Sequence, residues 1–263
     1  MRAPVIVTRP AAAGQRLQQK LKAAGYDVQW WPAFEFGPAP DADQARATLA
    51  RLAEFDLAIF VSPQAVQAAL SLLAAPWPAG TTIGAVGSAT GTALRSSPLT
   101  AAARIIEPID DESGSEAFWS AWTTAGGRAR RVLILRAPQG REWLADRFAA
   151  AGAAVEILAV YTRNDAAAPD AATRAWLRHA IASGSAPTTI VSSSESVDAL
   201  ERQLAATAGA ANWLKAGIAL ATHERIRDRL LDVGYTHVEL SAPDDDAILT
   251  RLESLGLPRS AGP

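Results

Sequence analysis

The chain has 263 residues, of which 49% are hydrophobic and 20% charged, a composition typical of a globular protein with a full core. The near balance of 25 basic and 27 acidic residues argues against a surface that coats nucleic acid, and the lack of cysteine excludes disulfides and thiolate chemistry. No apolar run approaches the roughly 20 residues that a membrane span needs.

Short apolar runs bounded by Gly, Pro or charged residues predict ten β-strands. In chain order these are residues 4–8, 28–31, 57–61, 82–86, 104–106, 131–135, 154–160, 188–191, 218–221 and 237–240. Helical patterns lie between most of them, for example at 15–24, 63–73, 141–151 and 224–231. Helices that alternate with continuously apolar strands are typical of α/β domains with a parallel sheet covered on both faces.

The first half of this pattern returns in the second half. Val5 corresponds to Val132 and Gly25 to Gly152, both at an offset of 127 residues. Three further matches follow in the same order: 59–66 with 190–197, 83–88 with 218–223, and 108–117 with 243–247. An internal repeat of this kind predicts two similar doubly wound parallel-sheet domains of about five strands each, with a ligand cleft between them.

Two segments interrupt the alternation of strands and helices, residues 32–40 and 162–169. Both follow the second strand of a repeat and have the Pro-rich or polar composition of linkers. If both cross between the domains, they form a hinge. The first domain is then residues 1–33 with 167–263, and the second is residues 36–163. The alternative, which the sequence leaves open, is two contiguous domains divided near Gly126 and Gly127.

The turns that follow the predicted strands are rich in small, hydroxylated and arginine residues. In doubly wound sheets, ligands bind beyond the carboxyl ends of the strands, where helix N-termini expose backbone amides. Hydroxyls, amides and guanidinium groups suit carboxylate or phosphate groups. The candidate binding residues are Arg9, Ser62, Gln64, Gly87, Ser88, Arg136, Gly140, Arg141, Ser192, Ser193, Ser194, Thr222 and His223.

Each candidate also has a purely structural interpretation. Ser62, Ser193 and Thr222 could be helix N-caps, and Arg9 and Arg136 could pair with surface carboxylates. The chain has no nucleophile elbow, phosphate-binding loop or dinucleotide fingerprint. We therefore expect mild or substrate-driven chemistry.

Two further features concern metals and location. The three histidines, His179, His223 and His237, have no metal-ligand spacing, so we expect no metal site. The N-terminus passes directly into a strand pattern, without an apolar segment and cleavage site, so we expect a cytoplasmic protein.

Taken together, these features resemble the uroporphyrinogen-III synthase family over nearly the whole chain. The stretches that carry the resemblance are residues 8–10, 60–66, 86–90, 135–136, 140–144, 160–163 and 221–226. No single stretch is diagnostic, but their order and spacing together are fairly specific. The sequence departs from the family at Gln64, where many relatives have a basic residue, and at Thr222 and His223, which replace a more usual Thr-rich turn.

The resemblance implies an enzyme without a cofactor that closes linear hydroxymethylbilane into uroporphyrinogen III, inverting the last pyrrole ring and losing water. It also implies two α/β domains joined by a pair of crossing segments. The substrate carries eight carboxylates, to which the residues at the turns are chemically suited. Tyr161 matches the family's tyrosine and is assigned to acid assistance at the leaving hydroxyl. Its alternative role is to pack the hinge.

Partners follow from the same resemblance. We expect a small-molecule substrate, no nucleic acid or membrane partner, and a monomer in transient contact with the enzyme that precedes it in the pathway. The alternative function, from another class, is a two-domain binding protein or sensor that closes on a small anion without chemistry. Analysis of the products formed from hydroxymethylbilane distinguishes the two.

Overall fold

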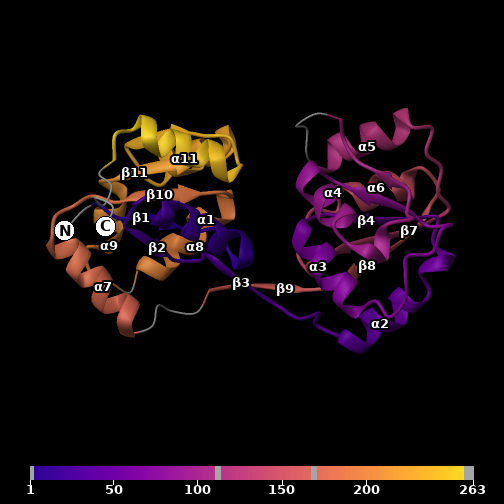
Figure 1. Cartoon of the computed structure of the whole chain (residues 1–263). Coiled ribbons are helices and arrows are strands. Elements are labelled where there is room, and N and C mark those ends of the chain that lie inside the picture. Colours follow the sequence, from indigo (N-terminus) through magenta and orange to yellow (C-terminus); the bar gives the residue numbers. More distant parts are fainter. Residues whose placement is uncertain (1–2, 110–113, 167–170, 206, 258–263) are drawn as a thin grey trace. The chain divides into compact units, whose positions relative to one another are not determined.

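The computed structural model describes residues 3–109, 114–166, 171–205 and 207–257 (Figure 1). The chain splits into two compact units, of which the first combines Met1–Phe36 with Asn164–Pro263 and the second is Gly37–Arg163. Both boundaries fall inside the two segments that we predicted as linkers, whereas Gly126 and Gly127 lie inside the second unit. Residues 110–113 and 167–169, which belong to a predicted repeat match and a predicted linker, lie outside the described residues.

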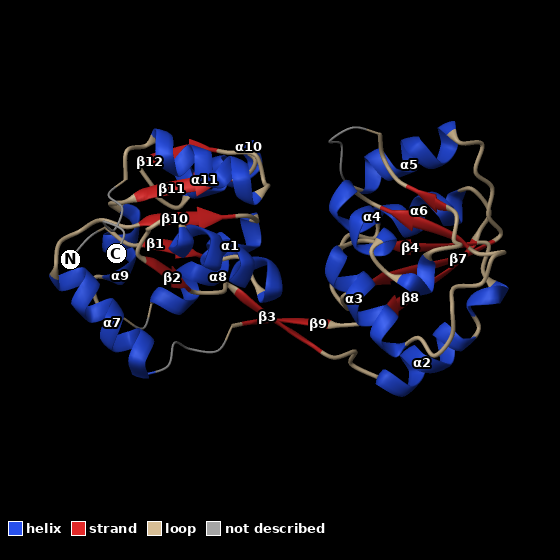
Figure 2. Cartoon of the chain, viewed as in Figure 1, coloured by secondary structure: helices blue, strands red, loops and turns tan. Residues whose placement is uncertain are grey.

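The first unit is a five-stranded parallel sheet with the order β12-β11-β10-β1-β2. Its strands are β1 (Val5–Val7), β2 (Val28–Trp30), β10 (Thr188–Val191), β11 (Ile218–Ala221) and β12 (His237–Leu240). Its helices are α1 (Ala11–Ala23), α7 (Ala171–Ala182), α8 (Ser194–Leu204), α9 (Ala210–Lys215), α10 (Glu224–Asp232) and α11 (Asp245–Ser254). Successive residues of a strand point to opposite faces. Val5 and Val7 therefore pack with α1 and α11, whereas Ile6 packs with α7 to α10 (Figure 2).

The second unit has the same architecture, with the strand order β6-β5-β4-β7-β8 and parallel pairing throughout. Its strands are β4 (Leu57–Phe60), β5 (Thr82–Ala85), β6 (Ile105–Ile106), β7 (Arg131–Arg136) and β8 (Ala154–Ala159). Its helices are α2 (Ala42–Ala50), α3 (Pro63–Leu72), α4 (Ser88–Arg95), α5 (Ser115–Thr124) and α6 (Trp143–Ala150), with short 3-10 turns at Leu52–Glu54 and Pro98–Thr100. On one face, α5 and α6 cover alternate residues of β4 and β7, such as Ile59 and Ile134.

All ten predicted strands are confirmed, each within one residue at either end. Strand pairing also confirms the repeat offset. Val5 pairs with both Thr188 and Val28, just as Val132 pairs with both Leu57 and Val155. β7 and β8 thus occupy in the second unit the positions that β1 and β2 occupy in the first.

One predicted repeat match is wrong by a single residue. We matched Ile83 with Ile218, but Thr82 pairs with Leu57 where Ile218 pairs with Thr188, so Thr82 is the residue equivalent to Ile218. A strand that is buried on both faces has no polar alternation to fix its register, so composition alone does not detect a slip of one.

The predicted linkers contain strands, which corrects our interpretation of them as segments without a packed element. β3 (Phe34–Gly37) and β9 (Thr162–Asp165) pair in a two-stranded sheet through which both connections between the units run (Figure 1). Prolines lie before and after β3 but not within it, so they bound the strand without removing its donors. The alternation Phe34-Glu35-Phe36 was the strand signal that the Pro-rich surroundings concealed.

Candidate functional site

In each unit, two neighbouring strands lead away in opposite directions. In the second unit, β4 continues to β5 on one side and β7 continues to β8 on the other. The carboxyl edge at such a switch point is where doubly wound sheets bind their ligands. Ser62 follows β4 and Arg136 ends β7, so two of the candidates lie at this edge. In the first unit the corresponding strands are β10 and β1, which lead to Ser193 and Arg9.

The hydroxyl of Ser62 joins a helix N-terminus to the predicted acid. As the N-cap of α3, its Oγ accepts a hydrogen bond from the backbone N–H of Ala65 at 3.1 Å, which confirms the capping interpretation. The same Oγ lies 3.2 Å from the Oη of Tyr161. Tyr161 directly precedes β9 and is buried, with 7% of its surface exposed. The structure therefore brings Ser62 and Tyr161 together.

The first unit supplies an internal comparison for this pair. At the repeat offset of 127, Phe34 is equivalent to Tyr161. Ser193 is equivalent to Ser62 at an offset of 131, which the strand pairing of β4 and β10 fixes. Ser193 caps α8, as predicted, and its Oγ lies 2.8 Å from the Oγ of Ser196. Phe34 is buried against Ala33 and Ala199. A phenyl ring thus suffices for packing at this position of the fold, and the hydroxyl is what the second unit adds.

Removing the Ser62 hydroxyl separates capping from contact with Tyr161. Ser62→Ala should destabilise the protein by about 1 kcal/mol through loss of the cap, and it should also lower kcat because the phenol loses a neighbour. Asp41→Ala is the matched control. Asp41 caps α2 by accepting from Gln44 N–H at 2.8 Å, and we assign it no part in the site. Denaturant unfolding and turnover should show similar stability losses but a fall in kcat for Ser62→Ala alone; equal turnover would contradict a role for Ser62 at the phenol.

Arg136 is a buried guanidinium held by its own loop. Its side chain is 8% exposed; Nη1 donates to the carbonyl of Arg141 at 2.9 Å, and Nη2 pairs with Glu142. Gly140 lies over this group, since a Cβ built there would be 3.4 Å from Nη1 of Arg136. Arg141 is exposed and forms an ion pair with Glu116, whose hydrogen bond from Arg141 holds the pKa of that carboxyl below its usual value.

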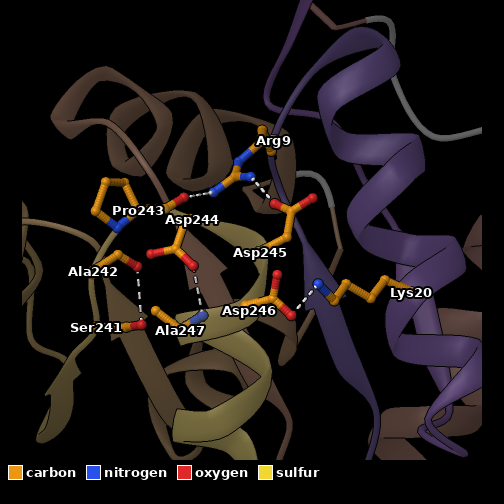
Figure 3. Close-up of polar contacts among 9 residues, drawn as sticks. All are labelled: Arg9, Lys20, Ser241, Ala242, Pro243, Asp244, Asp245, Asp246 and Ala247. Carbon is orange, nitrogen blue, oxygen red and sulfur yellow. Dashed lines mark hydrogen bonds and ion pairs between the residues drawn. The ribbon is translucent and has the colours of Figure 1, made fainter. Parts of the chain in front are cut away.

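Arg9, its equivalent in the first unit, connects the end of β1 to the start of α11. Its Nη1 donates to Asp245 at 2.6 Å and its Nη2 donates to the carbonyl of Pro243 at 2.9 Å (Figure 3). Beside it, Lys20 of α1 pairs with Asp246 at 2.6 Å. Both acidic residues lie in the first turn of α11, where the helix dipole favours negative charge. For Arg9, pairing with a carboxylate of the protein is what the structure shows.

The turn after β11 corrects one capping assignment. His223, not Thr222, is the N-cap of α10, and its Nδ1 accepts from the N–H of Arg225 at 3.1 Å. The backbone of Thr222 still follows the sheet, because its N–H donates to the carbonyl of Val191 at 3.3 Å. The helix begins at Glu224, as predicted, and only the identity of the capping residue differs from our assignment.

The remaining candidates lie at the same strand ends with fewer contacts. Gly87 is the N-cap of α4, and the exposed Ser88 begins that helix. Ser192 and Ser194 are partly exposed on either side of Ser193, although the Oγ of Ser194 is buried without a hydrogen bond to any described residue. Gln64 is half-buried in the first turn of α3.

Sequence reasoning missed the carboxylates that hold the two strand-end arginines. Glu142 is six residues after Arg136, in a segment that we singled out, but its contact with the guanidinium was not predicted. Asp245 is 236 residues from Arg9 and had no local signal at all. Within the described part of the chain, no cluster of three or more His, Asp or Glu residues is arranged to hold a metal ion. No described helix is both long and apolar enough to cross a membrane.

Comparisons with known proteins identify the family. The sequence profile of "Uroporphyrinogen-III synthase HemD" matches residues 15–250. Uroporphyrinogen-III synthase of Salmonella typhimurium LT2 is 29% identical over 253 residues, covering 95% of this chain and 99% of that protein. The synthase of Escherichia coli K12 is 33% identical over 162 residues, covering 60% of this chain and 64% of that protein, just under two thirds of its length.

Solved structures show the same fold. A mutant uroporphyrinogen III synthase from the extremely thermophilic bacterium Thermus thermophilus superposes with a TM-score of 0.59 at 15% identity, covering 96% of this chain and 98% of that one. Uroporphyrinogen-III synthetase from Helicobacter pylori 26695 gives a TM-score of 0.59 at 16% identity, covering 97% of this chain and 100% of that one. These superpositions establish the fold. The profile match over residues 15–250 establishes membership of the family. The chain belongs to the uroporphyrinogen-III synthase family.

Proposed function

We propose that this chain closes hydroxymethylbilane to uroporphyrinogen III, with inversion of the last pyrrole ring and loss of water. The observation that carries the proposal, in a chain of this family, is the Tyr161 phenol 3.2 Å from the Ser62 hydroxyl at the end of β4. A positioned phenol can donate a proton to a leaving hydroxyl. The Arg136 guanidinium at the end of the neighbouring strand β7 suits a carboxylate.

The chemistry needs little from the protein beyond that proton. When the terminal C–O bond of hydroxymethylbilane breaks, Tyr161 gives its proton to the departing hydroxyl, and water leaves. The resulting azafulvenium ion is electrophilic, so a pyrrole carbon of the same molecule attacks it. The ring closes after rearrangement through a spiro intermediate and loss of a proton from carbon, which restores the Tyr161 phenol. No protein nucleophile takes part, which agrees with the absence of a nucleophile motif from the sequence.

Positioning is the second task. Hydroxymethylbilane also closes spontaneously to the symmetric type I isomer, so the enzyme must hold the chain in the geometry that favours the spiro route. The N-termini of α3 and α8 offer backbone N–H groups beside Ser62 and Ser193, and such helix ends bind carboxylates. The spontaneous reaction also favours direct supply, so we place this chain, as a cytoplasmic monomer, in transient contact with the enzyme that makes hydroxymethylbilane.

Isomer analysis tests the proposal. Hydroxymethylbilane is generated enzymatically in the presence of the purified, metal-stripped chain, and the oxidised products are separated by chromatography. We expect predominantly the type III isomer, against the type I isomer in the control without the chain. Products identical to that control would reject the synthase function and favour a protein that only binds a small anion.

A further inference from the structure

The two strand-end arginines are held by the same kinds of acceptor, but these acceptors lie at very different distances along the chain. Arg9 and Arg136, equivalent at the repeat offset of 127, each donate to one carboxylate and one backbone carbonyl. The acceptors of Arg9 lie 236 and 234 residues away and join the last helix to the first strand (Figure 3). The acceptors of Arg136 lie only five and six residues away, in the loop that follows its own strand.

The guanidinium of Arg136 is only partly satisfied. In the exposed pair of Arg202 with Asp165, the arginine Nε and Nη2 each donate at 2.8 Å to a different carboxylate oxygen, forming a two-pronged contact. In Arg136, only Nη2 meets a carboxylate oxygen, that of Glu142. The Nε of Arg136 is buried and has no hydrogen-bond partner among the residues described. Of the two donors that could bind both oxygens of a carboxylate, Nη2 is therefore occupied and Nε is not.

Glu142 has little else to hold it in place. Its side chain is 58% exposed, against 8% for Arg136. It occupies the N-cap position of α6, but its carboxylate makes no capping hydrogen bond. The carboxylate can therefore leave the arginine for solvent without breaking the helix end, whereas Arg136 stays fixed at the end of β7.

We propose that Glu142 is a stand-in for a carboxylate of the substrate, which displaces it and takes both Nε and Nη2 of Arg136. This inference rests on the proposed function and adds a specificity-determining residue to it. One ion pair replaces another, so the buried guanidinium is never left unpaired, which would be strongly unfavourable. A ligand without a carboxylate cannot displace Glu142, and the loop then stays closed over Arg136.

The kinetic test removes the competitor. Glu142→Gln keeps the size of the side chain but loses its charge, so the substrate should meet weaker competition for Arg136. We expect KM for hydroxymethylbilane to fall by about two- to fivefold, the range that corresponds to a partly exposed ion pair, with kcat unchanged within the error. If Glu142 only holds Arg136 in position, the opposite is expected, because Glu142→Gln would loosen Arg136 and raise KM or lower kcat. An unchanged or raised KM overturns the stand-in role.

The matched control lies at the other end of the same strand. Glu54 pairs with Arg131, the first residue of β7, at 3.0 Å, and both side chains are partly exposed. Glu54 also pairs with Arg51 at 3.5 Å. Glu54→Gln therefore removes the ion pairs of a partly exposed glutamate far from the carboxyl edge, and its KM should equal that of the wild type.

A second measurement does not depend on a variant. Arginine Nε–H signals of the ¹⁵N-labelled wild-type protein are recorded while uroporphyrin III, the stable oxidised form of the product, is added. The Arg136 signal, assigned with Arg136→Lys, should move downfield as its Nε–H gains an acceptor; a signal that stays in place at saturation overturns the proposal. If the wild type forms no type III isomer, the proposed function itself has failed. If it does form that isomer and both tests are negative, only the role of Glu142 has failed.

Discussion

Replacing Tyr161 with phenylalanine should lower the rate of type III formation by roughly 10²–10⁴-fold, the effect expected when a positioned acid is lost. The melting temperature should hardly change, because the ring still fills its place and a phenylalanine, Phe34, fills the equivalent place in the first unit. Single-turnover kinetics with enzymatically generated hydroxymethylbilane, together with thermal unfolding, would measure both quantities.

Tyr235→Phe is the control for removal of a buried phenol. Tyr235 is 2% exposed, packs with α8 and α10, and its Oη has no hydrogen-bond partner in the described part of the chain. Burial and the nearby Glu201 raise the pKa of Tyr235, so its phenol keeps its proton and is a weaker acid than a free tyrosine. We expect turnover like that of the wild type. If Tyr161→Phe were equally active, and Tyr161→Ala cost the 3–5 kcal/mol that is typical of a truncated buried aromatic residue, Tyr161 would be a packing residue only.

A fragment of residues 36–163 should fold alone, whereas a fragment of residues 1–126 should not. The first contains every strand of the β6-β5-β4-β7-β8 sheet and the helices that cover it. The second ends before β7, so β4 loses the partner that pairs with it from Leu57 to Phe60, and β1 loses β10. Two isolated strands such as β1 and β2 are at best marginally stable. The strands β4 to β6 would keep an unpaired apolar edge at β4, where β7 is missing.

Amide dispersion in ¹⁵N–¹H spectra and denaturant unfolding decide the matter. Residues 36–163 should give dispersed signals and one cooperative transition, and residues 1–126 should give neither. A cooperative, well-dispersed 1–126 fragment would favour the contiguous division near Gly126 that the sequence left open.

The sheets could be predicted because their strands are buried on both faces. Runs such as Val132–Leu135 are continuously apolar and end at charged or small residues, so their bounds are visible in the sequence. The repeat predicted two similar sheets, and equivalent strands do take equivalent places in them, but the order of the strands was not predicted. β3 and β9 were missed because prolines or polar residues dominate the sequence around each of these short strands.

The candidate site was predicted less completely. Helix capping by Ser62 and Ser193 could be foreseen, because a capping hydroxyl acts within three residues of its own position. The partners of Arg9 and Arg136 could not, because ion pairing depends on which carboxylate the tertiary fold brings near. His223 rather than Thr222 caps α10, because the backbone N–H of Thr222 still donates to Val191 of the neighbouring strand β10. The apolar pattern, which ends at Ala221, does not reveal this bond.

The division of each sheet between distant parts of the chain sets an order for folding during synthesis. The ribosome completes β4 to β8 before it reaches β10, so the second unit can form while the first is unfinished. β1 and β2 must wait for Thr188, the start of β10, about 160 residues after Trp30, a delay on the order of ten to thirty seconds at typical elongation rates. Throughout that interval β1, which in the finished sheet lies between β10 and β2, presents an unpaired apolar edge on the nascent chain. Because unpaired apolar strands favour aggregation, we expect the chain to aggregate most readily, and to depend most on chaperones, during this interval of synthesis.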